Sequence, residues 1–131
     1  TAARQAVIDA VVRFDQPFTA EDVLAKLYHL GHQIHRATVY RDILLFAHAG
    51  LLKELSIQGS QAHYYELASQ THHHHFICRS CLTIIDVIPT QVEEALRRYE
   101  TQLQTEGLQV EYHQLKFYGR CPRCQAGSTD Q

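Results

Sequence analysis

Apolar residues in the first part of the chain recur at helical spacing. Between residues 2 and 14 they fall on one face of a helix that Thr1 can cap, and Pro17 interrupts the pattern. A second helix is predicted after Thr19, with Glu21 and Asp22 in its first turn, where the helix dipole favours negative charge. Its apolar stripe consists of Val23, Leu24, Leu27 and Leu30.

Glycines mark the ends of two predicted helices. Gly31 ends the second helix, and Gly50 ends a third that runs from about Arg36 to about Ala49. Two helices joined by a short turn are typical of a helix-turn-helix. After Gly50 the spacing becomes strand-like over 52–57 and 62–67, with 58–61 as the turn, which predicts a β-hairpin wing.

The second part of the chain combines strands with one helix. Residues 68–71 are small and polar and are interpreted as a hinge. Strands are predicted over 72–78, 82–87 and 108–118, and a helix from about Pro89 to Glu106 with an apolar stripe at Val92, Leu96, Tyr99 and Leu103. The pattern therefore predicts an α+β protein: a winged helix-turn-helix domain over 1–67, a small α/β domain over 72–124 and a disordered tail over 125–131.

Composition narrows the class of protein. Apolar residues make up 45% of the chain, which is enough for a hydrophobic core, and no apolar run is long enough to span a bilayer. We therefore expect a soluble, cytoplasmic protein with no membrane partner. Residues 1–60 carry six basic and six acidic side chains, and residues 61–131 carry six and eight. Any DNA binding must come from the local placement of charge.

The four cysteines form two Cys-x-x-Cys pairs, Cys78/Cys81 and Cys121/Cys124. Two such pairs complete a tetrahedral thiolate site for zinc, and four thiolates leave no open position for a substrate. The spacing therefore predicts a structural Zn²⁺ in a four-cysteine knuckle. The alternatives are a redox dithiol and unrelated core cysteines, and a redox dithiol would place one pair at a strand-to-helix turn.

Four consecutive histidines, His72 to His75, lie within a predicted strand. Because neighbouring side chains on a strand point to opposite faces, His73 and His75 share one face and His72 and His74 share the other. Each pair can begin a metal site. The candidates to complete these sites are Glu66, Asp86, Glu93 and His113. The alternative is that some of these histidines are solvated or are hydrogen-bonded core residues.

The third predicted helix opens with candidate DNA-contacting residues. In a helix-turn-helix, the first residues of the second helix of the pair meet base edges and phosphates. Those positions hold Arg36, Thr38, Tyr40 and Arg41. The alternative is an ordinary amphipathic helix with solvated arginines.

Several motifs together resemble the ferric uptake regulator family in order and spacing. They are Thr19-Ala-Glu-Asp, Ala37-Thr-Val-Tyr-Arg, Tyr65-Glu-Leu, His72-His-His-His-Phe-Ile-Cys-x-x-Cys and Cys121-x-x-Cys. The resemblance covers about residues 1–124. It implies a homodimer that binds a palindromic double-stranded DNA operator when a sensor metal is loaded, with residues 72–124 as the dimerisation domain.

The resemblance also assigns the candidate ligands to sites. Glu66, His73, His75 and Asp86 resemble a regulatory site, and His72, His74, Glu93 and His113 resemble a second metal site. The sensor ion would be Fe²⁺ or Zn²⁺, with Mn²⁺ as a further alternative. Phe18 or Pro17 stands where many members carry a histidine ligand, so either His63, His35 or His32 replaces it or the regulatory site is four-coordinate.

Two further substitutions bear on the metal subtype. His74 stands where the family commonly has an aspartate, and a histidine at this position resembles zinc-sensing members. Asp86 stands where iron sensors more often have a glutamate and peroxide sensors have an aspartate. The prediction is a repressor of metal-uptake or stress-response genes, iron-responsive in the first instance, with zinc-responsive and peroxide-sensing members as alternatives. A metalloenzyme or a metal-storage protein is the alternative from another class. No nucleophile or general base accompanies the histidines, and we expect no catalysis.

Overall fold

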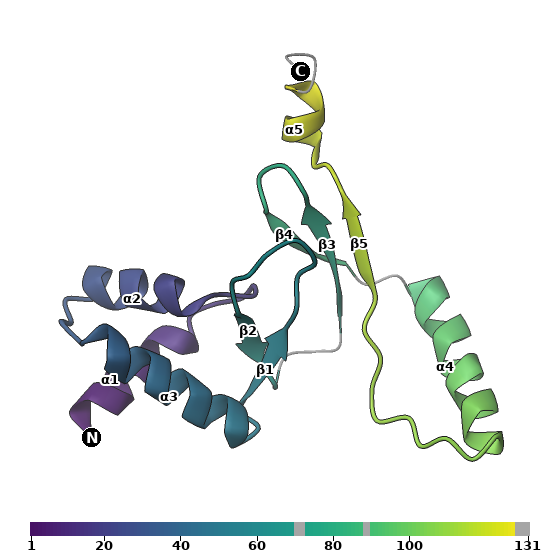
Figure 1. Ribbon diagram of the computed structural model, residues 1–131, viewed down its shortest axis with the longest axis horizontal. Coiled ribbons are helices and arrows are strands. Elements are labelled where there is room, and N and C mark those ends of the chain that lie inside the picture. Colours follow the sequence, from purple (N-terminus) through teal and green to yellow (C-terminus); the bar gives the residue numbers. More distant parts are fainter. Residues whose placement is uncertain (70–72, 88–89, 128–131) are drawn as a thin grey trace. The chain divides into compact units, whose positions relative to one another are not determined.

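The chain divides into two compact units, Thr1–Thr71 and His72–Gln131. The computed structural model describes residues 1–69, 73–87 and 90–127 (Figure 1). Within these ranges, no helix has both the length and the apolar character needed to cross a membrane.

Three helices form the first part of unit one: α1 (Ala2–Val11), α2 (Ala20–His29) and α3 (Arg36–His48). A capping box starts α2, because the Thr19 hydroxyl accepts from the Asp22 amide at 3.1 Å and the Asp22 carboxylate accepts from the Thr19 amide at 2.9 Å. Gly31 follows α2 with a φ of +87°, a conformation that favours glycine. The first helix is shorter than the predicted 2–14, since Phe14 lies beyond its end and stacks on Phe18 at 4.7 Å.

A short antiparallel wing follows the helices. Strand β1 (Leu52–Leu55) pairs with β2 (Tyr64–Leu67), so each strand is two residues shorter than predicted. Phe18 adds an isolated antiparallel bridge to Tyr65, with backbone hydrogen bonds of 2.9 and 2.8 Å. This bridge ties the segment between α1 and α2 to the wing.

The core of unit one draws on all of its elements. Fully buried side chains include Val7 of α1, Leu27 of α2, Val39 and Ile43 of α3, and Phe18. One face of α3 is therefore committed to the core. The opposite face, which carries the arginines, remains exposed.

Unit two contains a three-stranded sheet in the order β4-β3-β5. Strand β3 (His74–Cys78) is central, with β4 (Ile84–Val87) antiparallel to it and β5 (Lys116–Gly119) parallel to it. Helix α4 (Thr90–Thr105) lies between β4 and β5 in the chain, and a five-residue helix α5 (Pro122–Ala126) follows β5. Apolar residues with little exposure are few in the described part of this unit: Ile77, Cys78, Ile84 and Cys121.

Two sequence predictions for unit two are wrong. The predicted strand over 108–118 is a strand only from Lys116, because residues 108–115 have no ladder partner among the described residues. The predicted disordered tail, 125–131, begins within α5, a helix that Pro122 favours by its place in the first turn. Residues 128–131 of the tail, residues 70–71 of the hinge, His72 and Pro89 lie outside the described residues.

Candidate metal centres and nucleic-acid interface

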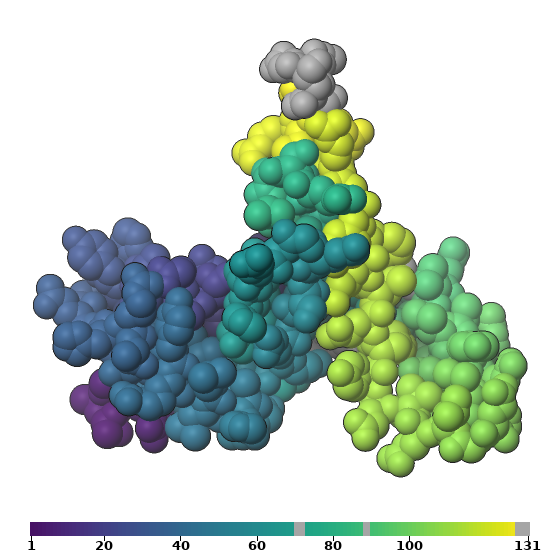
Figure 2. Space-filling model, in the orientation of Figure 1, coloured from purple at the N-terminus to yellow at the C-terminus, as the bar shows by residue number. Residues whose placement is uncertain are grey.

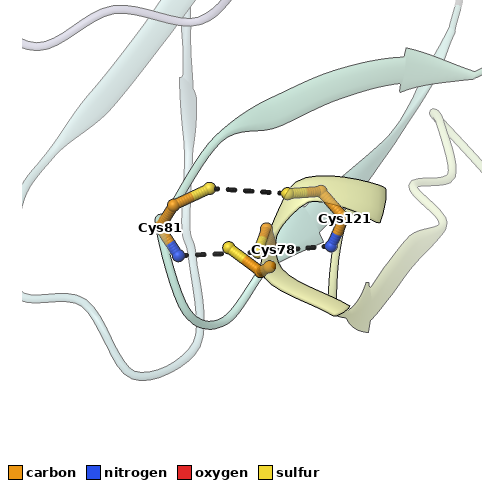
Figure 3. A group of neighbouring side chains, drawn as sticks. Cys78, Cys81 and Cys121 are labelled. Atoms are coloured by element: carbon orange, nitrogen blue, oxygen red, sulfur yellow. Dashed lines mark hydrogen bonds between the residues drawn. The ribbon is translucent and has the colours of Figure 1, made fainter. Parts of the chain in front are cut away.

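The two cysteine pairs meet at one end of the sheet in unit two. Cys78 ends β3 and Cys81 lies in the turn after it, while Cys121 and Cys124 come from the start of α5. All four sulfur atoms lie within 4.8 Å of one another, and no disulfide joins them. Figure 3 shows Cys78, Cys81 and Cys121 turned toward one another.

Backbone amides hold part of this cluster in the thiolate form. The amides of Cys81 and Cys121 donate to Cys78 Sγ at 3.5 and 3.4 Å, which lowers the pKa of the Cys78 thiol to about 5. A hydrogen bond with Thr83 at 3.0 Å lowers the pKa of Cys81. In contrast, the adjacent sulfur atoms of Cys121 and Cys78 raise the pKa of Cys124 to about 12. Crowded sulfur atoms of this kind bind a cation because it neutralises their mutual repulsion.

The donor set fits tetrahedral zinc. Zn–S bonds of about 2.3 Å place neighbouring sulfur atoms about 3.8 Å apart in a tetrahedron. The Cys81 and Cys121 sulfur atoms are 3.8 Å apart. Cys78, Cys81, Cys121 and Cys124 would hold the ion, and its role would be to tie β3 to the end of β5.

His73 and His75 lie on one side of β3 beside Asp86 of β4. Their rings are 4.8 Å apart between centroids, and their Nε2 atoms lie 3.6 and 3.8 Å from Asp86 Oδ1. These separations are too long for hydrogen bonds. They are close to the roughly 3.3–3.6 Å between ligand atoms in a tetrahedral site with bonds of about 2.0–2.2 Å. This group of two imidazoles and a carboxylate therefore fits a divalent metal ion.

His74 lies on the other side of β3, with Glu93 of α4 and His113. Glu93 Oε2 is 2.7 Å from His74 Nε2, and Glu93 Oε1 is 2.6 Å from His113 Nε2. These are hydrogen-bond distances, so a metal ion in this group would replace both bonds and separate the ligand atoms by about 1 Å or less. The carboxylates of Glu100 and Glu93, which accept hydrogen bonds from the protonated ring, raise the pKa of His113, and Glu100 has the larger effect.

The two histidines of this second group differ in the partner of their other ring nitrogen. The Leu115 amide donates to His74 Nδ1 at 3.0 Å, so that nitrogen accepts and the proton of a neutral ring is on Nε2. His113 Nδ1 instead lies 2.7 Å from Glu100 Oε2 while its Nε2 lies 2.6 Å from Glu93 Oε1, so a carboxylate faces each ring nitrogen. A metal that replaces the Nε2–Glu93 hydrogen bond would leave the proton of His113 on Nδ1, where Glu100 can accept it. His74 can bind a metal through Nε2 only if it gives up its Leu115 bond or its remaining proton.

The other predicted ligands lie in unit one. Glu66 is on β2, opposite Lys53 of β1, and its participation in a site with His73 and His75 remains a prediction. His63 lies 2.8 Å from Glu54 within the wing. Within unit one, none of the candidates His32, His35 and His63 belongs to a group of three potential ligands among the described residues.

The predicted DNA-contacting residues lie at the start of α3. Arg36, Tyr40 and Arg41 are exposed on the first turns of the helix, and Thr38 beside them is half-buried. The Tyr40 hydroxyl donates to Glu21 Oε2 at 2.8 Å, and Arg36 forms an ion pair with the same carboxylate oxygen. The first turn of α2 thus holds two side chains of the exposed face of α3.

Two of these contacts involve residues that the sequence interpretation missed. In the sequence, Glu21 is explained by the helix dipole alone, which gives no reason to expect a contact with α3. No sequence motif marks Glu100 as a functional residue. Glu93 and Glu100 are seven residues apart, which is two helical turns, so their shared face is the available signal. Nothing local indicates that His113 lies against that face.

Comparison with known proteins gives a consistent picture. The sequence profile described as "Ferric uptake regulator family" matches residues 1–118. The ferric uptake regulation protein of Vibrio vulnificus is 32% identical over 126 residues, which cover 92% of this chain and 79% of the relative.

Solved structures show the same similarity. The Vibrio cholerae ferric uptake regulator superposes with a TM-score of 0.77 at 29% identity, covering 92% of this chain and 90% of that one. The Francisella tularensis ferric uptake regulator, solved with iron, gives a TM-score of 0.78 at 28% identity, covering 95% and 92%.

Proposed function

Because this chain belongs to the ferric uptake regulator family, we propose that it is a cytoplasmic, metal-dependent repressor that binds DNA at the operators of metal-uptake or stress-response genes. Unit one would bind the operator, and unit two would hold the metal ions. The observation that carries the proposal is the division of the histidines by β3, which places His73 and His75 with Asp86 and places His74 with Glu93 and His113.

The proposed switch is the first of these groups. A sensor ion would be held by His73, His75 and Asp86, and by Glu66 from the end of the wing. A ligand from each unit would let the ion bias the spacing of the recognition helices. Such an ion shifts the equilibrium only by its differential affinity for the two states. The second group would hold a further ion within unit two, where His72 is the remaining proposed ligand.

Iron is the sensor metal that we propose first, because the matched relatives are ferric uptake regulation proteins. Zn²⁺ remains an alternative because His74 enriches the second group in nitrogen donors, and Mn²⁺ is a further one. Affinity alone does not identify the physiological ion, because the order of metal affinities is similar for most such sites. Metal analysis of the protein isolated from its native host tests this point.

A homodimer is supported by the surface of α4. The helix is amphipathic, yet two residues of its apolar stripe, Val92 and Tyr99, are 43% and 55% exposed. Tyr112, in the segment that follows, is 75% exposed. In Figure 2, α4 is green and the segment that follows it is yellow-green. Exposed apolar surface of this kind marks an interface, and we propose a second copy of the chain as its partner.

DNA binding is proposed for the exposed face of α3. Val39 and Ile43 direct one face of the helix into the core, which leaves Tyr40 and Arg41 directed outward. These side chains suit contacts to a thymine methyl group and to guanine or phosphate. A family of regulators accounts for these residues, whereas a metalloenzyme or a metal-storage protein would not require them.

The proposal is tested by operator affinity measured against metal concentration. A DNA pool selected with the iron-loaded protein supplies the operator. His73→Ala/His75→Ala should abolish the metal response and leave a folded dimer, whereas His74→Ala should lower affinity but keep a response. Arg41→Ala should weaken binding with metal content unchanged.

Two results would count against this assignment. If the His73/His75 variant responds to metal like the parent, the switch is not on that side of β3. If Arg41→Ala binds normally at physiological salt, where phosphate contacts are already partly screened, α3 is not the recognition helix.

A further inference from the structure

The two nitrogens of His113 face two different carboxylates of α4. Nε2 lies 2.6 Å from Glu93 Oε1, and Nδ1 lies 2.7 Å from Glu100 Oε2. Glu93 and Glu100 are two helical turns apart and share one face of α4. The imidazole ring therefore lies between them, with Glu93 on the side of His74 and Glu100 on the opposite side.

We propose that Glu100 is a positioning residue for the second metal site, which makes this inference rest on the function proposed above. When an ion replaces the hydrogen bond between Nε2 and Glu93, Glu100 accepts the proton on Nδ1 and so leaves the Nε2 lone pair to the ion. A carboxylate in this position fixes the ring orientation and makes the imidazole a stronger donor to a metal. No ligand set proposed above includes Glu100.

The position of Glu100 argues against a direct ligand role. The two ring nitrogens point away from each other, so an ion held by Nε2 and Glu93 lies on the far side of the ring from Glu100. The His113 and Glu100 side chains are only 21% and 25% exposed, so water competes weakly for this charge-assisted hydrogen bond.

His74 shows why such a partner matters in this chain. Its Nδ1 accepts from the Leu115 amide, which places the proton of a neutral ring on the nitrogen that faces Glu93. The carboxylate of Glu100 has the opposite effect on His113. Glu100 therefore makes His113 the stronger imidazole donor of the second site among the described residues.

The test uses the full chain with zinc alone, after the four-cysteine site is filled, and the parent carries His73→Ala/His75→Ala so that the proposed switch site takes no zinc. Second-site affinity is measured by competition with a chelator, and the His113 tautomer is measured by ¹⁵N NMR on protein whose second site is empty, at a pH where the ring is neutral. Glu100→Ala should weaken zinc binding by about 10–100-fold and reduce the Nδ1–H tautomer. Glu100→Gln keeps a carbonyl acceptor, so it should retain the tautomer with a smaller loss of affinity.

Glu94→Gln is the matched control. It removes the same charge from α4, where Glu94 is exposed and lies 3.8 Å from Arg98, and it should change neither readout. Three results would overturn the proposal. The first is a Glu100→Ala variant with the affinity and tautomer of the parent, while His113→Ala loses the ion. In that case the second site exists but Glu100 does not position His113. The second is a loss in Glu100→Ala as complete as in Glu93→Ala, which would make Glu100 a ligand. The third is a parent chain that binds no second ion, which would overturn the proposed second site as well.

Discussion

Loss of one cysteine ligand should disorder unit two and spare unit one. In Cys121→Ser, the hydroxyl is a poor replacement for a thiolate, and the amide contact to Cys78 Sγ no longer closes a four-sulfur site. The variant should retain little zinc in metal analysis. Its three-stranded sheet should lose stability, because the ion ties β3 to the end of β5.

The magnitude follows from how little apolar surface unit two buries. Its two buried isoleucines, Ile77 and Ile84, contribute about 3–6 kcal/mol together at about 1.5–3 kcal/mol each. A structural zinc contributes about 10–16 kcal/mol in zinc-finger peptides at neutral pH. The metal contribution is therefore about twice the apolar one or more, and we expect the sheet to unfold without it.

Hydrogen exchange locates the effect. The Arg79 amide donates to the Gly119 carbonyl at 2.8 Å across β3 and β5, and it should lose its protection in Cys121→Ser. The Tyr65 amide, bonded to Phe18 at 2.8 Å in unit one, is the internal control and should stay protected. Ser80→Ala, in the exposed turn of the knuckle, is the matched variant and should behave like the parent. Native zinc content with full Arg79 protection in Cys121→Ser would refute the reasoning.

Three further predictions concern other parts of the chain. Glu21→Gln removes a negative charge beside the exposed face of α3. Affinity for random-sequence DNA, measured by fluorescence anisotropy, should rise several-fold, and the slope of log affinity against log salt concentration should steepen by up to about 1. An unchanged slope would contradict this prediction. When the second site holds no metal, the pKa of His113 is raised by Glu100 and, to a smaller extent, by Glu93. Protonation of His113 therefore stabilises the fold fully below about pH 6.5, and this stabilisation is lost as the pH rises through the raised pKa. The free energy of unfolding, measured against pH, should show this fall in the parent and not in His113→Gln, and identical profiles would exclude it. Leu27→Ala opens a cavity in the core of unit one and should lower its stability by about 2–5 kcal/mol in denaturant melts, while the zinc content stays constant. A loss below about 1 kcal/mol would contradict the expected cost of this cavity.

Local patterns are enough to predict most of the helices and strands. The 3.6-residue spacing of apolar residues, the Thr19 cap and Gly31 predict α2 without knowledge of any distant contact, because each acts within one or two turns. The alternation of side chains along a strand is equally local. It predicts that His73 and His75 lie on one side of β3 and His74 on the other, which the described geometry shows.

The metal chemistry of the cysteines can also be predicted from the sequence, because a Cys-x-x-Cys pair in a turn directs its two sulfur atoms to one point whatever surrounds the turn. The extent of the strand predicted over 108–118 is not, since apolar spacing does not reveal whether a neighbouring strand is available to pair. Only Lys116–Gly119 finds such a neighbour within the described chain.

Tertiary structure alone decided how the candidate ligands are tuned. The Leu115 amide, which sets the tautomer of His74, lies 41 residues further along the chain. The two carboxylates that face His113 belong to α4 residues 13 and 20 positions earlier in the chain. Glu21 likewise meets Arg36 and Tyr40 only because α2 and α3 pack together. Residue type and spacing determine which atoms can bind a metal or DNA. The proton that each atom carries depends on partners that folding brings within about 3 Å, and no local periodicity encodes those partners.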